Sequence, residues 1–414
     1  MILLSHPTGN QNVRQALQAF YDADFLAEYV TSVATFEGNL FGYLSKTKIG
    51  ADFERRRYKQ QLVDITRLHP NYDMARMIAS KLRASWLTQH EIGLFSVDAI
   101  YRDMDRYASK RVIKNVSRGR LSTVYGYEDG ALQMFESAKS KGLKCIYELP
   151  IAYWKTSRQL LNEEACRLPQ WSDTLVGILD SEKKFARKDR ELELADVIIC
   201  PSDFVRDSLP AHIRESKPTY VIPFGSPEIA LSKAVLSAQS SLPLKVLFAG
   251  SMTQRKGLSD LFEAMKLLDT KNFELHVLGS PVVELEFYKQ QYAEFIHHPP
   301  CSHAEVMKLM QSCDVFVLPS IVEGRALVQQ EALACGLPII VTKNAGAEDL
   351  VEDGTAGFIV PIRNPSAIAE RLNYLHLNRD ELEVMKVAAH AKSQQVTWQN
   401  YRSGLVNIIT EHRS

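Results

Sequence analysis

The sequence lacks the features that mark membrane-spanning, secreted or nucleic-acid-binding proteins. It has no run of about 18 apolar residues, so no bilayer-spanning helix is expected. Residues Met1–His6 lack the basic flank and long apolar core of a signal peptide and instead predict a buried first strand. Lys and Arg number 49, as do Asp and Glu, so the cationic surplus that binds nucleic-acid phosphates is absent. We therefore predict no nucleic-acid partner.

Paired cysteines and metal-ligand patterns are also missing. The six cysteines form no CxxC pair, and several stand in apolar runs, which predicts buried thiols in a reducing cytoplasm. His297 and His298 are adjacent, but no further residues stand at metal-ligand spacing around them. We therefore predict no metal site.

The sequence does contain a regular alternation of strand-like and helix-like segments. Its 414 residues favour two or three domains. Strands rich in Val, Ile and Leu between amphipathic stretches are typical of parallel sheets with helices on both faces. The predicted fold class is α/β, with two Rossmann-like domains facing across a cleft. The clearest predicted strands are 121–125, 144–147, 196–200, 220–223, 245–249, 274–278, 314–319, 338–341 and 357–360.

The best internal boundary is the Pro-Phe-Gly-Ser-Pro segment at 223–227, which a Ser-, Ala- and Leu-rich stretch follows up to Pro243. Gly and Pro there interrupt both the helix and the strand periodicity. We predict an N-terminal domain over residues 1–225 and a C-terminal domain over 226–395. A final helix in 396–414 is expected to pack back on the N-terminal domain.

The most informative motif follows the strand that ends at Leu318-Pro319-Ser320. If the next helix begins near Arg325, Glu323 lies on the loop and Glu331 about two turns into the helix. The first amides of that helix have no partner within it and suit a phosphate or diphosphate. Carboxylates only accept hydrogen bonds and therefore suit hydroxyl groups. The motif predicts a nucleotide-sugar site.

A second motif, residues 246–257, reads Val-Leu-Phe-Ala-Gly-Ser-Met-Thr-Gln-Arg-Lys-Gly. A buried strand ends at Gly250, and Arg255 and Lys256 follow on the loop. Such cations neutralise a departing diphosphate, Arg through a bidentate fork and Lys as a point charge. Two loop cations are by themselves more often solvated, but the neighbouring Glu323–Glu331 motif favours the diphosphate site.

Together with Asn-Ala-Gly at 344–346 and Asp-Gly-Thr-Ala-Gly at 353–357, these motifs resemble the retaining glycosyltransferases of family 4, which have the GT-B fold. The resemblance covers most of the chain after about residue 191. It implies two Rossmann-like domains and transfer from a nucleoside-diphosphate sugar with retention of configuration. It also implies that no metal or other cofactor is required.

The resemblance also implies roles for individual residues. Glu323 would contact the donor sugar, Glu331 the ribose, and Arg255 with Lys256 the diphosphate. Amides near Ala326 and Leu327 would complete the phosphate site. The full set of expected donor-binding residues is Gly9, Gly250, Arg255, Lys256, Gly279, Glu323, Arg325, Ala326, Leu327 and Glu331.

The sequence departs from the family pattern in three places. Arg325-Ala326 stand where members often have Phe-Gly, so this loop is expected to present a guanidinium on the sugar side. Ser251 stands where some members have an Arg. Where many members have a His near the reacting centre, this chain has Glu128 and Asp129. These carboxylates are candidates to orient or deprotonate the acceptor, and capping of the next helix by Asp129 is the alternative.

Other residues of the first half are further candidates for the site. Glu148 ends the next strand and is a further acceptor-side candidate. Gly9, in the first strand–helix turn, is expected to let the backbone approach the diphosphate or the acceptor. Tyr153, Trp154 and Trp171 suit a sugar platform or the core, and the core is favoured.

Basic residues gather at 55–59 and along 102–120, where spacings of three and four predict one face of a helix. This face suits either solvent or an anionic partner, which would be lipid headgroups or an anionic acceptor. The predicted location is the cytoplasm, with peripheral contact to the inner face of the membrane left open.

The predicted function is transfer of a hexose from a nucleoside-diphosphate sugar to a saccharide, glycolipid or other hydroxyl acceptor, as in polysaccharide biosynthesis. One alternative is a nucleotide-sugar epimerase or hydrolase of similar fold. The other is a catalytically silent nucleotide-sugar-binding subunit, against which the intact Glu323, Glu331, Arg255 and Lys256 argue.

Overall fold

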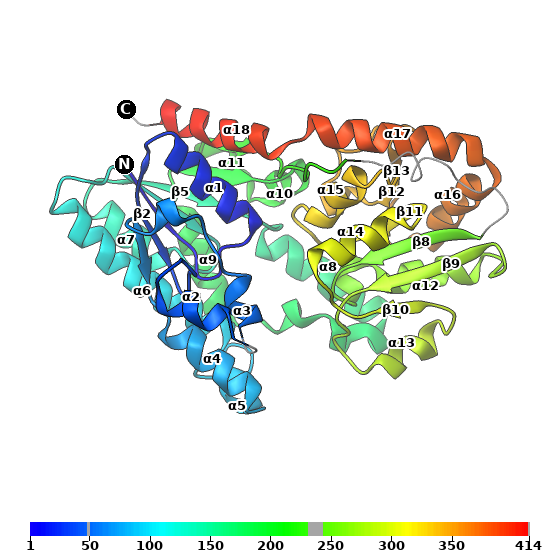
Figure 1. Ribbon diagram of the computed structural model, residues 1–414, viewed down its shortest axis with the longest axis horizontal. Coiled ribbons are helices and arrows are strands. Elements are labelled where there is room, and N and C mark those ends of the chain that lie inside the picture. The colour runs from blue at the N-terminus through cyan, green and yellow to red at the C-terminus, as the bar shows by residue number, and fades with distance from the viewer. Residues whose placement is uncertain (48–49, 231–242, 413–414) are drawn as a thin grey trace.

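The computed structural model describes the chain except for residues 48–49, 231–242 and 413–414. Two α/β lobes lie side by side, each built around a sheet (Figure 1). The seven-stranded sheet has the order β3-β2-β1-β4-β5-β6-β7, and the six-stranded sheet has the order β10-β9-β8-β11-β12-β13. Neighbouring strands within each sheet run parallel. The predicted pair of Rossmann-like domains is confirmed.

The strands of the N-terminal lobe are β1 (Ile2–Ser5), β2 (Leu26–Thr31), β3 (Thr66–Leu68), β4 (Thr123–Tyr127), β5 (Lys144–Glu148), β6 (Val197–Cys200) and β7 (Thr219–Val221). Its helices are α1 (Gln11–Asp22), α2 (Leu40–Ser45), α3 (Ala51–Glu54), η1 (Gln60–Leu62), α4 (Asn71–Lys81), α5 (Ser85–Thr88), α6 (Val97–Val116), α7 (Leu132–Lys139), α8 (Trp154–Arg167), η2 (Pro169–Thr174), η3 (Val176–Leu179), α9 (Glu182–Leu194), α10 (Asp203–Ser208) and α11 (Ala211–Ser216).

The strands of the C-terminal lobe are β8 (Leu244–Ala249), β9 (Phe273–Leu278), β10 (Ile296–His298), β11 (Val315–Leu318), β12 (Ile339–Val341) and β13 (Gly357–Ile359). Its helices are η5 (Gln254–Lys256), α12 (Leu258–Lys266), α13 (Leu285–Gln291), α14 (His303–Gln311), α15 (Leu327–Ala334), η6 (Lys343–Ala345), α16 (Pro365–Leu377) and α17 (Arg379–Gln395), and α18 (Trp398–Glu411) follows them.

Alternation of side chains along the strands divides the N-terminal core between the two faces of its sheet. Leu4 of β1 packs in a cluster with residues of α1 and α18. Leu3, its neighbour, packs in a second cluster with residues of α6 and α7. Because helices cover both faces, all four residues of β1 are buried, as an apolar first strand predicts.

The last helix returns to the N-terminal lobe. In Figure 1, α17 and α18 run along one side of the molecule from the C-terminal lobe to the N-terminal lobe. Tyr401, Leu405 and Ile408 of α18 are buried in the cluster that contains β1 and α1. The predicted return of the C-terminal helix is confirmed.

The two chain crossings between the lobes lie side by side. The Ser226 amide donates to the Val396 carbonyl at 2.7 Å, and Ser226 forms a bridge with Thr397. Gly225 packs so closely on Trp398 that a Cβ atom would lie 2.1 Å from its amide nitrogen. Most of the predicted linker up to Pro243 lies outside the described residues.

One segment of the N-terminal half packs on the C-terminal lobe. Helices α8, η2 and η3, between β5 and α9, make this excursion, and Trp171 of η2 is fully buried in the core of the C-terminal lobe. The Arg167 guanidinium binds the Asp260 carboxylate through two 2.9 Å hydrogen bonds. A boundary placed at residue 225 from the sequence does not reveal this contact.

Within the described part of the chain, none of the helices has the length and apolar character needed to cross a lipid bilayer. All six cysteines are free; four are buried, and Cys166 and Cys301 are exposed.

Candidate active site

A cavity of about 600 Å³ lies between the two lobes, and we call it the interdomain cavity. The N-terminal lobe and the first crossing contribute Asn10, Asn12, Pro150 and Phe224 to its walls. The C-terminal lobe contributes Ala249, Gly250, Ser251, Lys256, Leu278, Gly279, Ser280, Pro300, Cys301, Val306, Glu323, Arg325, Ala326, Leu327 and Val328. Seven of the ten predicted donor-binding residues thus line one cavity.

Two loops at the carboxyl ends of β8 and β11 meet in this cavity, because these strands are neighbours in the sheet. The amide of Ile321 donates to the Arg255 carbonyl at 2.9 Å. Gly257 ends η5 with a φ of +72°, and a Cβ atom there would lie 2.0 Å from the Pro319 carbonyl oxygen. A residue without a side chain is needed for so close an approach and for that φ. The two motifs, more than 60 residues apart in sequence, therefore share one site.

Glu323 is held by both predicted cations. Its Oε2 lies 2.6 Å from Lys256 Nζ and 3.0 Å from Arg255 Nη1. The Arg255 guanidinium also donates to the Val322 carbonyl at 2.9 Å. Gly250, with a φ of +146°, leaves room for the Lys256 side chain, whose Cδ would lie 2.9 Å from a Cβ atom at that position. The loops thus gather one carboxylate and two cations, of which Glu323 and Lys256 line the cavity and Arg255 does not.

The two cations of this cluster control the pKa of Glu323. Burial would raise the pKa of Glu323, but the nearby Arg255 and Lys256 lower it to about 2. The Glu323 side chain is 14% exposed and that of Lys256 is 12% exposed. The carboxylate is therefore charged at neutral pH.

This lowered pKa makes a pH dependence of stability measurable. The folded-state pKa lies below the ordinary value of 4.5, so the stabilisation is present above about pH 4.5 and is lost as the pH falls towards 2. We expect wild type to lose at most about 3 kcal/mol more unfolding free energy than Glu323→Gln over that range. Urea titrations of both proteins between pH 6 and 2 measure the gap. A gap that stays constant would contradict the ion cluster.

The start of α15 forms another part of the wall. The helix begins at Leu327, two residues later than the sequence predicts. No side chain caps its first turn, and Ala326, Leu327 and Val328 all line the cavity. An uncapped helix start carries a partial positive charge and free amides, which suit an anionic group.

Glu331, one turn further along α15, does not line the interdomain cavity. Its Oε1 lies 3.6 Å from Nδ1 of His303, the first residue of α14. Burial raises the pKa of Glu331, and His303 opposes this increase. Its predicted contact with the ribose stays a prediction.

Arg325 lies at the cavity, but its guanidinium is already engaged. Nη1 and Nη2 bind the two carboxylate oxygens of Asp349 at 2.5 and 3.1 Å, and Nη1 also lies 3.3 Å from the Gly346 carbonyl. The side chain is fully buried. The loop therefore does not present a free guanidinium to a sugar, in contrast to the expectation from the sequence.

Glu128 and Asp129 do not line the interdomain cavity. Glu128 Oε2 lies 3.3 Å from Lys188 Nζ, and Asp129 Oδ1 accepts from Arg187 at 2.9 Å. Burial raises the pKa of Glu128 despite Lys188. Burial would also raise the pKa of Asp129, but Lys188, Lys184 and Arg187 lower it. Both carboxylates belong to a buried ion network with α9, and an acceptor-side role for them stays a prediction.

The alternative role of Asp129, as the cap of the next helix, is wrong. The N-cap residue of α7 is Ala131, and its side chain makes no capping bond. The Asp105 carboxylate accepts from the amides of Gln133 and Met134 at 2.7 and 2.9 Å instead. A carboxylate from α6 has this function because α6 packs directly on α7.

Glu148 is fully occupied by partners in the N-terminal lobe. It accepts from Asn12 Nδ2 at 2.9 Å, from the Tyr125 hydroxyl at 2.5 Å and from the Tyr401 hydroxyl at 3.2 Å. Burial raises its pKa. Since Asn12 lines the interdomain cavity, Glu148 positions a residue of the cavity wall and connects it to α18.

The first turn of the chain reaches the cavity through Asn10 and not through Gly9. The Gly9 amide donates to His6 Nδ1 at 2.9 Å, and a Cβ atom on Gly9 would lie 1.7 Å from the Tyr58 hydroxyl. Burial lowers the pKa of His6 to about 3. Its neutral ring therefore accepts this hydrogen bond and shapes the loop.

The aromatic candidates pack in the interior, as favoured from the sequence. Tyr153 and Trp154 both donate to Asp189 at 2.5 Å. Trp154 also stacks on Phe185.

His297 Nε2 lies 2.9 Å from the carbonyl of Gly279. Among the described residues, the one group with metal-ligand geometry is His90, Glu91 and Asp180, far in sequence from His297.

Sequence reasoning missed the wall that the N-terminal lobe contributes. Asn12 carries no motif, and Phe224 stands in a segment read only as a linker. Phe224 is fixed there because its carbonyl accepts from Gln330 Nε2 of α15 at 2.9 Å. Asn10 directly follows the predicted Gly9 turn. That turn was the one feature of the sequence that pointed to a cavity wall in the N-terminal lobe.

Comparison with known proteins supports this description of the C-terminal lobe. Residues 237–392 match the family model described as Glycosyl transferases group 1. The D-inositol 3-phosphate glycosyltransferase of Paenarthrobacter aurescens (strain TC1) is 29% identical over 187 residues, which cover 41% of this chain and 46% of that protein. The chain spans about half the length of the curated relatives it matches.

Two solved structures match almost the whole chain in fold. The sucrose-phosphate synthase from Thermosynechococcus elongatus aligns with a TM-score of 0.69 and 15% identity, and the alignment covers 99% of this chain and 98% of that one. The Anabaena HepE structure in complex with UDP aligns with a TM-score of 0.62 and 14% identity over 99% of both chains. The two lobes are therefore arranged as in these GT-B proteins.

Proposed function

We propose that the protein is a retaining glycosyltransferase that transfers a hexose from a nucleoside-diphosphate sugar to a hydroxyl acceptor. The observation that carries this proposal is the meeting of Lys256 and Glu323 with the uncapped start of α15 in one cavity between the lobes. Arg255 does not line the cavity but binds Glu323 from behind its wall. The match of residues 237–392 to group 1 glycosyltransferases supports it. HepE, which shares the fold, has been solved with UDP and with UDP-glucose.

In this proposal the cavity wall of the C-terminal lobe holds the donor. The diphosphate lies between the Arg255–Lys256 pair and the amides at Ala326 and Leu327. Glu323 exchanges part of its ion pairing for the sugar hydroxyls, and Glu331 binds the ribose. Gly250 and Gly279 let the diphosphate and the base approach the backbone.

Catalysis then consists mainly of stabilising the charge that develops. The bond between the anomeric carbon and the diphosphate oxygen breaks, and the electron pair leaves with the phosphate. In this proposal Lys256, held against Glu323 together with Arg255, stabilises that charge without reorganisation during the reaction. The acceptor oxygen attacks from the same face, and its proton passes to the departing phosphate oxygen. No strong general base is therefore required, and we propose that no metal is required either.

The acceptor would approach from the N-terminal lobe, near Asn10, Asn12 and Pro150. We propose a saccharide or lipid-linked hydroxyl as acceptor and the cytoplasm as location. Closure of the lobes about the paired crossings at 224–226 and 396–398 would exclude water from the reacting centre. The α8–η2 excursion would move with the C-terminal lobe, since Trp171 is part of that core.

Thermal-shift measurements with UDP-, GDP- and ADP-sugars test the donor site directly. A ligand that binds only the folded protein stabilises it by about 2.7 kcal/mol at 100 times its Kd. We expect one nucleotide class to raise Tm in wild type and to raise it much less in Lys256→Ala. Analysis of the products with candidate acceptors then distinguishes transfer from hydrolysis or epimerisation. No stabilisation by any of the three classes would contradict the proposal.

A further inference from the structure

The basic face predicted along 102–120 is partly neutralised by carboxylates of the same lobe. Arg102 pairs with Asp98 at 2.8 Å and Arg106 with Asp103 at 3.1 Å. The Arg111 guanidinium binds both oxygens of buried Glu28 at 2.5 Å. This face of α6 therefore offers fewer available cations than its sequence indicates.

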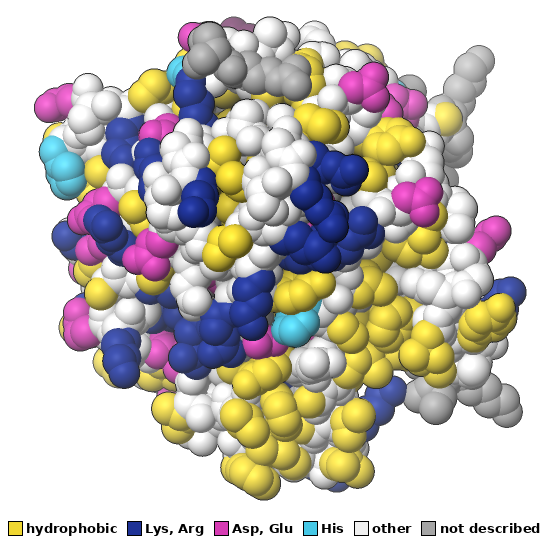
Figure 2. Space-filling model, turned by 90° about the vertical axis from the view of Figure 1, so that its left-hand side faces the viewer, with side chains coloured by type: hydrophobic (Ala, Val, Ile, Leu, Met, Phe, Trp, Pro, Cys, Tyr) yellow, Lys and Arg dark blue, Asp and Glu magenta, His cyan; other side chains and the backbone are white. Residues whose placement is uncertain are grey.

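A different part of the N-terminal lobe exposes apolar side chains. Helices α4 and α5 and the loop to α6 lie at one end of the lobe (Figure 1). Leu82 is 74% exposed, Trp86 72% and Ile92 76%. We call this set the apolar tip, and its members are Ile78, Leu82, Trp86, Ile92, Leu94 and Val97. Figure 2 shows a field of hydrophobic side chains at the end of the lobe where α4 and α5 lie, with Lys and Arg beside it.

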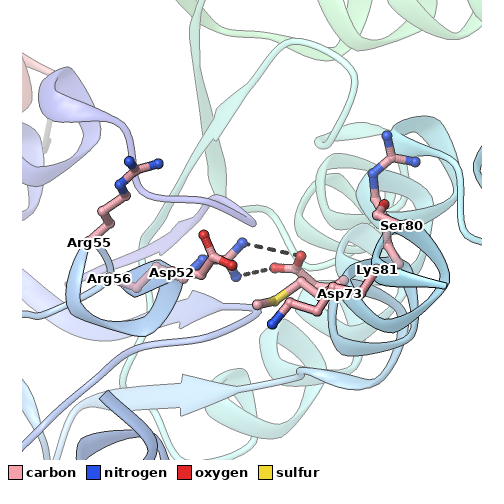
Figure 3. A pocket seen from close by; sticks show the side chains of 8 residues that line it. Asp52, Arg55, Arg56, Asp73, Ser80 and Lys81 are labelled. Carbon is pink, nitrogen blue, oxygen red and sulfur yellow. Dashed lines mark hydrogen bonds and ion pairs between the residues drawn. The ribbon is translucent and has the colours of Figure 1, made fainter. Parts of the chain in front are cut away.

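A basic pocket of about 510 Å³ adjoins this tip. Figure 3 shows Asp52 of α3 with Arg55 and Arg56, which follow it, on one side, and Asp73 and Lys81 of α4 on the other. The lining has four cations, Arg55, Arg56, Arg76 and Lys81, against the two carboxylates Asp52 and Asp73. Arg56 is paired with Asp73, which fixes the two walls relative to each other. Lys81 of the pocket directly precedes Leu82 of the apolar tip.

Several cations of this region have no partner that neutralises them. Among the described residues, the side chains of Arg55, Lys81 and Arg83 form no ion pair, and all three are exposed. Arg76 donates to the carbonyls of Thr88 and Phe95 at 3.1 and 2.9 Å. These neutral acceptors connect α4 to α5 and its following loop but do not neutralise the guanidinium. Between residues 73 and 91 the chain has three basic residues and no acidic residue.

We propose that the apolar tip and the basic pocket dock the protein on an anionic lipid bilayer. In this arrangement Trp86, Leu82 and Ile78 insert at the level of the headgroups, and Arg55 with Lys81 binds a headgroup phosphate in the basic pocket. Surfaces that lie in a membrane interface typically combine exposed Trp and Leu with Lys and Arg. Free cations close to such a surface are attracted by anionic lipid.

Charge and shape together favour a bilayer over a protein partner. An apolar patch of this extent on a soluble protein marks a contact surface. The patch lies on the end of a lobe, which can press into a broad, deformable layer. The cations around the patch are attracted by the negative potential of anionic lipid. Trp side chains are enriched at membrane–water interfaces. This proposal concerns the surface of the N-terminal lobe and does not depend on the proposed transferase activity.

Vesicle co-sedimentation tests the proposal on the full chain. The probes are phosphatidylcholine vesicles and vesicles that also contain about one third phosphatidylglycerol. We expect wild type to bind the anionic vesicles much more tightly than the neutral ones. Arg55→Glu with Lys81→Glu is expected to weaken binding by about 25-fold or more, since each cation contributes roughly fivefold.

The apolar contribution has its own variant and matched control. Ile78→Ser, Leu82→Ser and Trp86→Ser combined should weaken binding by at least about tenfold. Leu377→Ser with Val384→Ser, two equally exposed apolar residues of the C-terminal lobe, should leave binding unchanged. All substituted side chains are exposed, so the Tm of each variant should match wild type within a few degrees.

Tryptophan fluorescence gives a second readout that does not rely on sedimentation. Of the four Trp residues, Trp86 is exposed, and Trp154, Trp171 and Trp398 are buried or half-buried. Anionic vesicles should therefore shift the emission of wild type to the blue, and Trp86→Ser should lose this shift. Arg55→Glu with Lys81→Glu should show the shift only at much higher lipid concentration.

Three results would overturn the proposal. One is equal binding of wild type and both variants to anionic vesicles. Another is loss of binding in Lys110→Glu with Lys114→Glu, which would assign the contact to the exposed side of α6. The third is a change in oligomeric state without lipid when the apolar tip is replaced, which would assign the tip to a second copy of the chain.

Discussion

Replacing Lys256 with alanine is expected to lower kcat by about 10²- to 10³-fold, the usual effect of removing one preorganised group that stabilises developing charge. Lys256 Nζ lies 2.6 Å from Glu323, and among the described residues Lys256 is the one Lys that lines the cavity. Without it, the departing diphosphate would be stabilised by Arg255 and the start of α15 alone. The measurement is the steady-state rate with the nucleotide-sugar that thermal shift identifies.

The accompanying loss of stability should be small, because Arg255 still pairs with Glu323. Lys266→Ala is the matched control: Lys266 is an exposed lysine of α12 that pairs with Glu263 within the same helix. It should change neither kcat nor Tm appreciably. If Lys256→Ala lost activity only in proportion to folded protein, the residue would be structural and its assignment to the donor site would fail.

Replacing Trp171 with alanine is expected to destabilise the protein by about 3–5 kcal/mol, the range for removing a large buried aromatic side chain. Trp171 is fully buried and packs against Phe262, Phe287 and Tyr288 of the C-terminal lobe. Its loss would leave a cavity where the α8–η2 excursion enters that core. Urea unfolding monitored by circular dichroism measures the change.

Trp86→Ala provides a matched control, since it deletes the same side chain at a position that is 72% exposed. In the absence of lipid its effect should lie within about 0.5 kcal/mol of wild type. Similar stability of the two variants would contradict the placement of Trp171. A loss confined to the N-terminal lobe in limited proteolysis would contradict it as well, because the side chain belongs to the other core.

The strands that the sequence predicted best are the ones with an almost continuous apolar run. Segment 196–200 became β6, and 245–249 became β8 with a shift of one residue. The strands β2, β3 and β10 were missed. Glu28 interrupts the apolar pattern of β2, and its charge is matched by Arg111 of α6, 83 residues away. The residues around Glu28 do not indicate that Arg111 will pair with it.

The two loops that meet in the candidate site were predictable for a related reason. Each of its motifs is a short strand–loop–helix unit, so the residues before Gly257 and after Pro319 could be placed on loops from local signals alone. That the two loops meet follows from the adjacency of β8 and β11 in the sheet. The engagement of Arg325 by Asp349, 24 residues later, was not visible in any local pattern.

The sequence by itself determined the class of fold, the two loops that follow β8 and β11, and the return of the last helix, because periodicity and turn chemistry act over a few residues. Only the tertiary structure decided which charges are free. It paired Arg102, Arg106 and Arg111 and left Arg55 and Lys81 exposed. It also brought Asn12 and Phe224 to the cavity and Trp171 into the opposite lobe. The Arg111–Glu28 pair, the cavity wall and the burial of Trp171 depend on contacts between segments that are far apart in the sequence. Arg102 and Arg106 instead pair with Asp98 and Asp103 of their own helix.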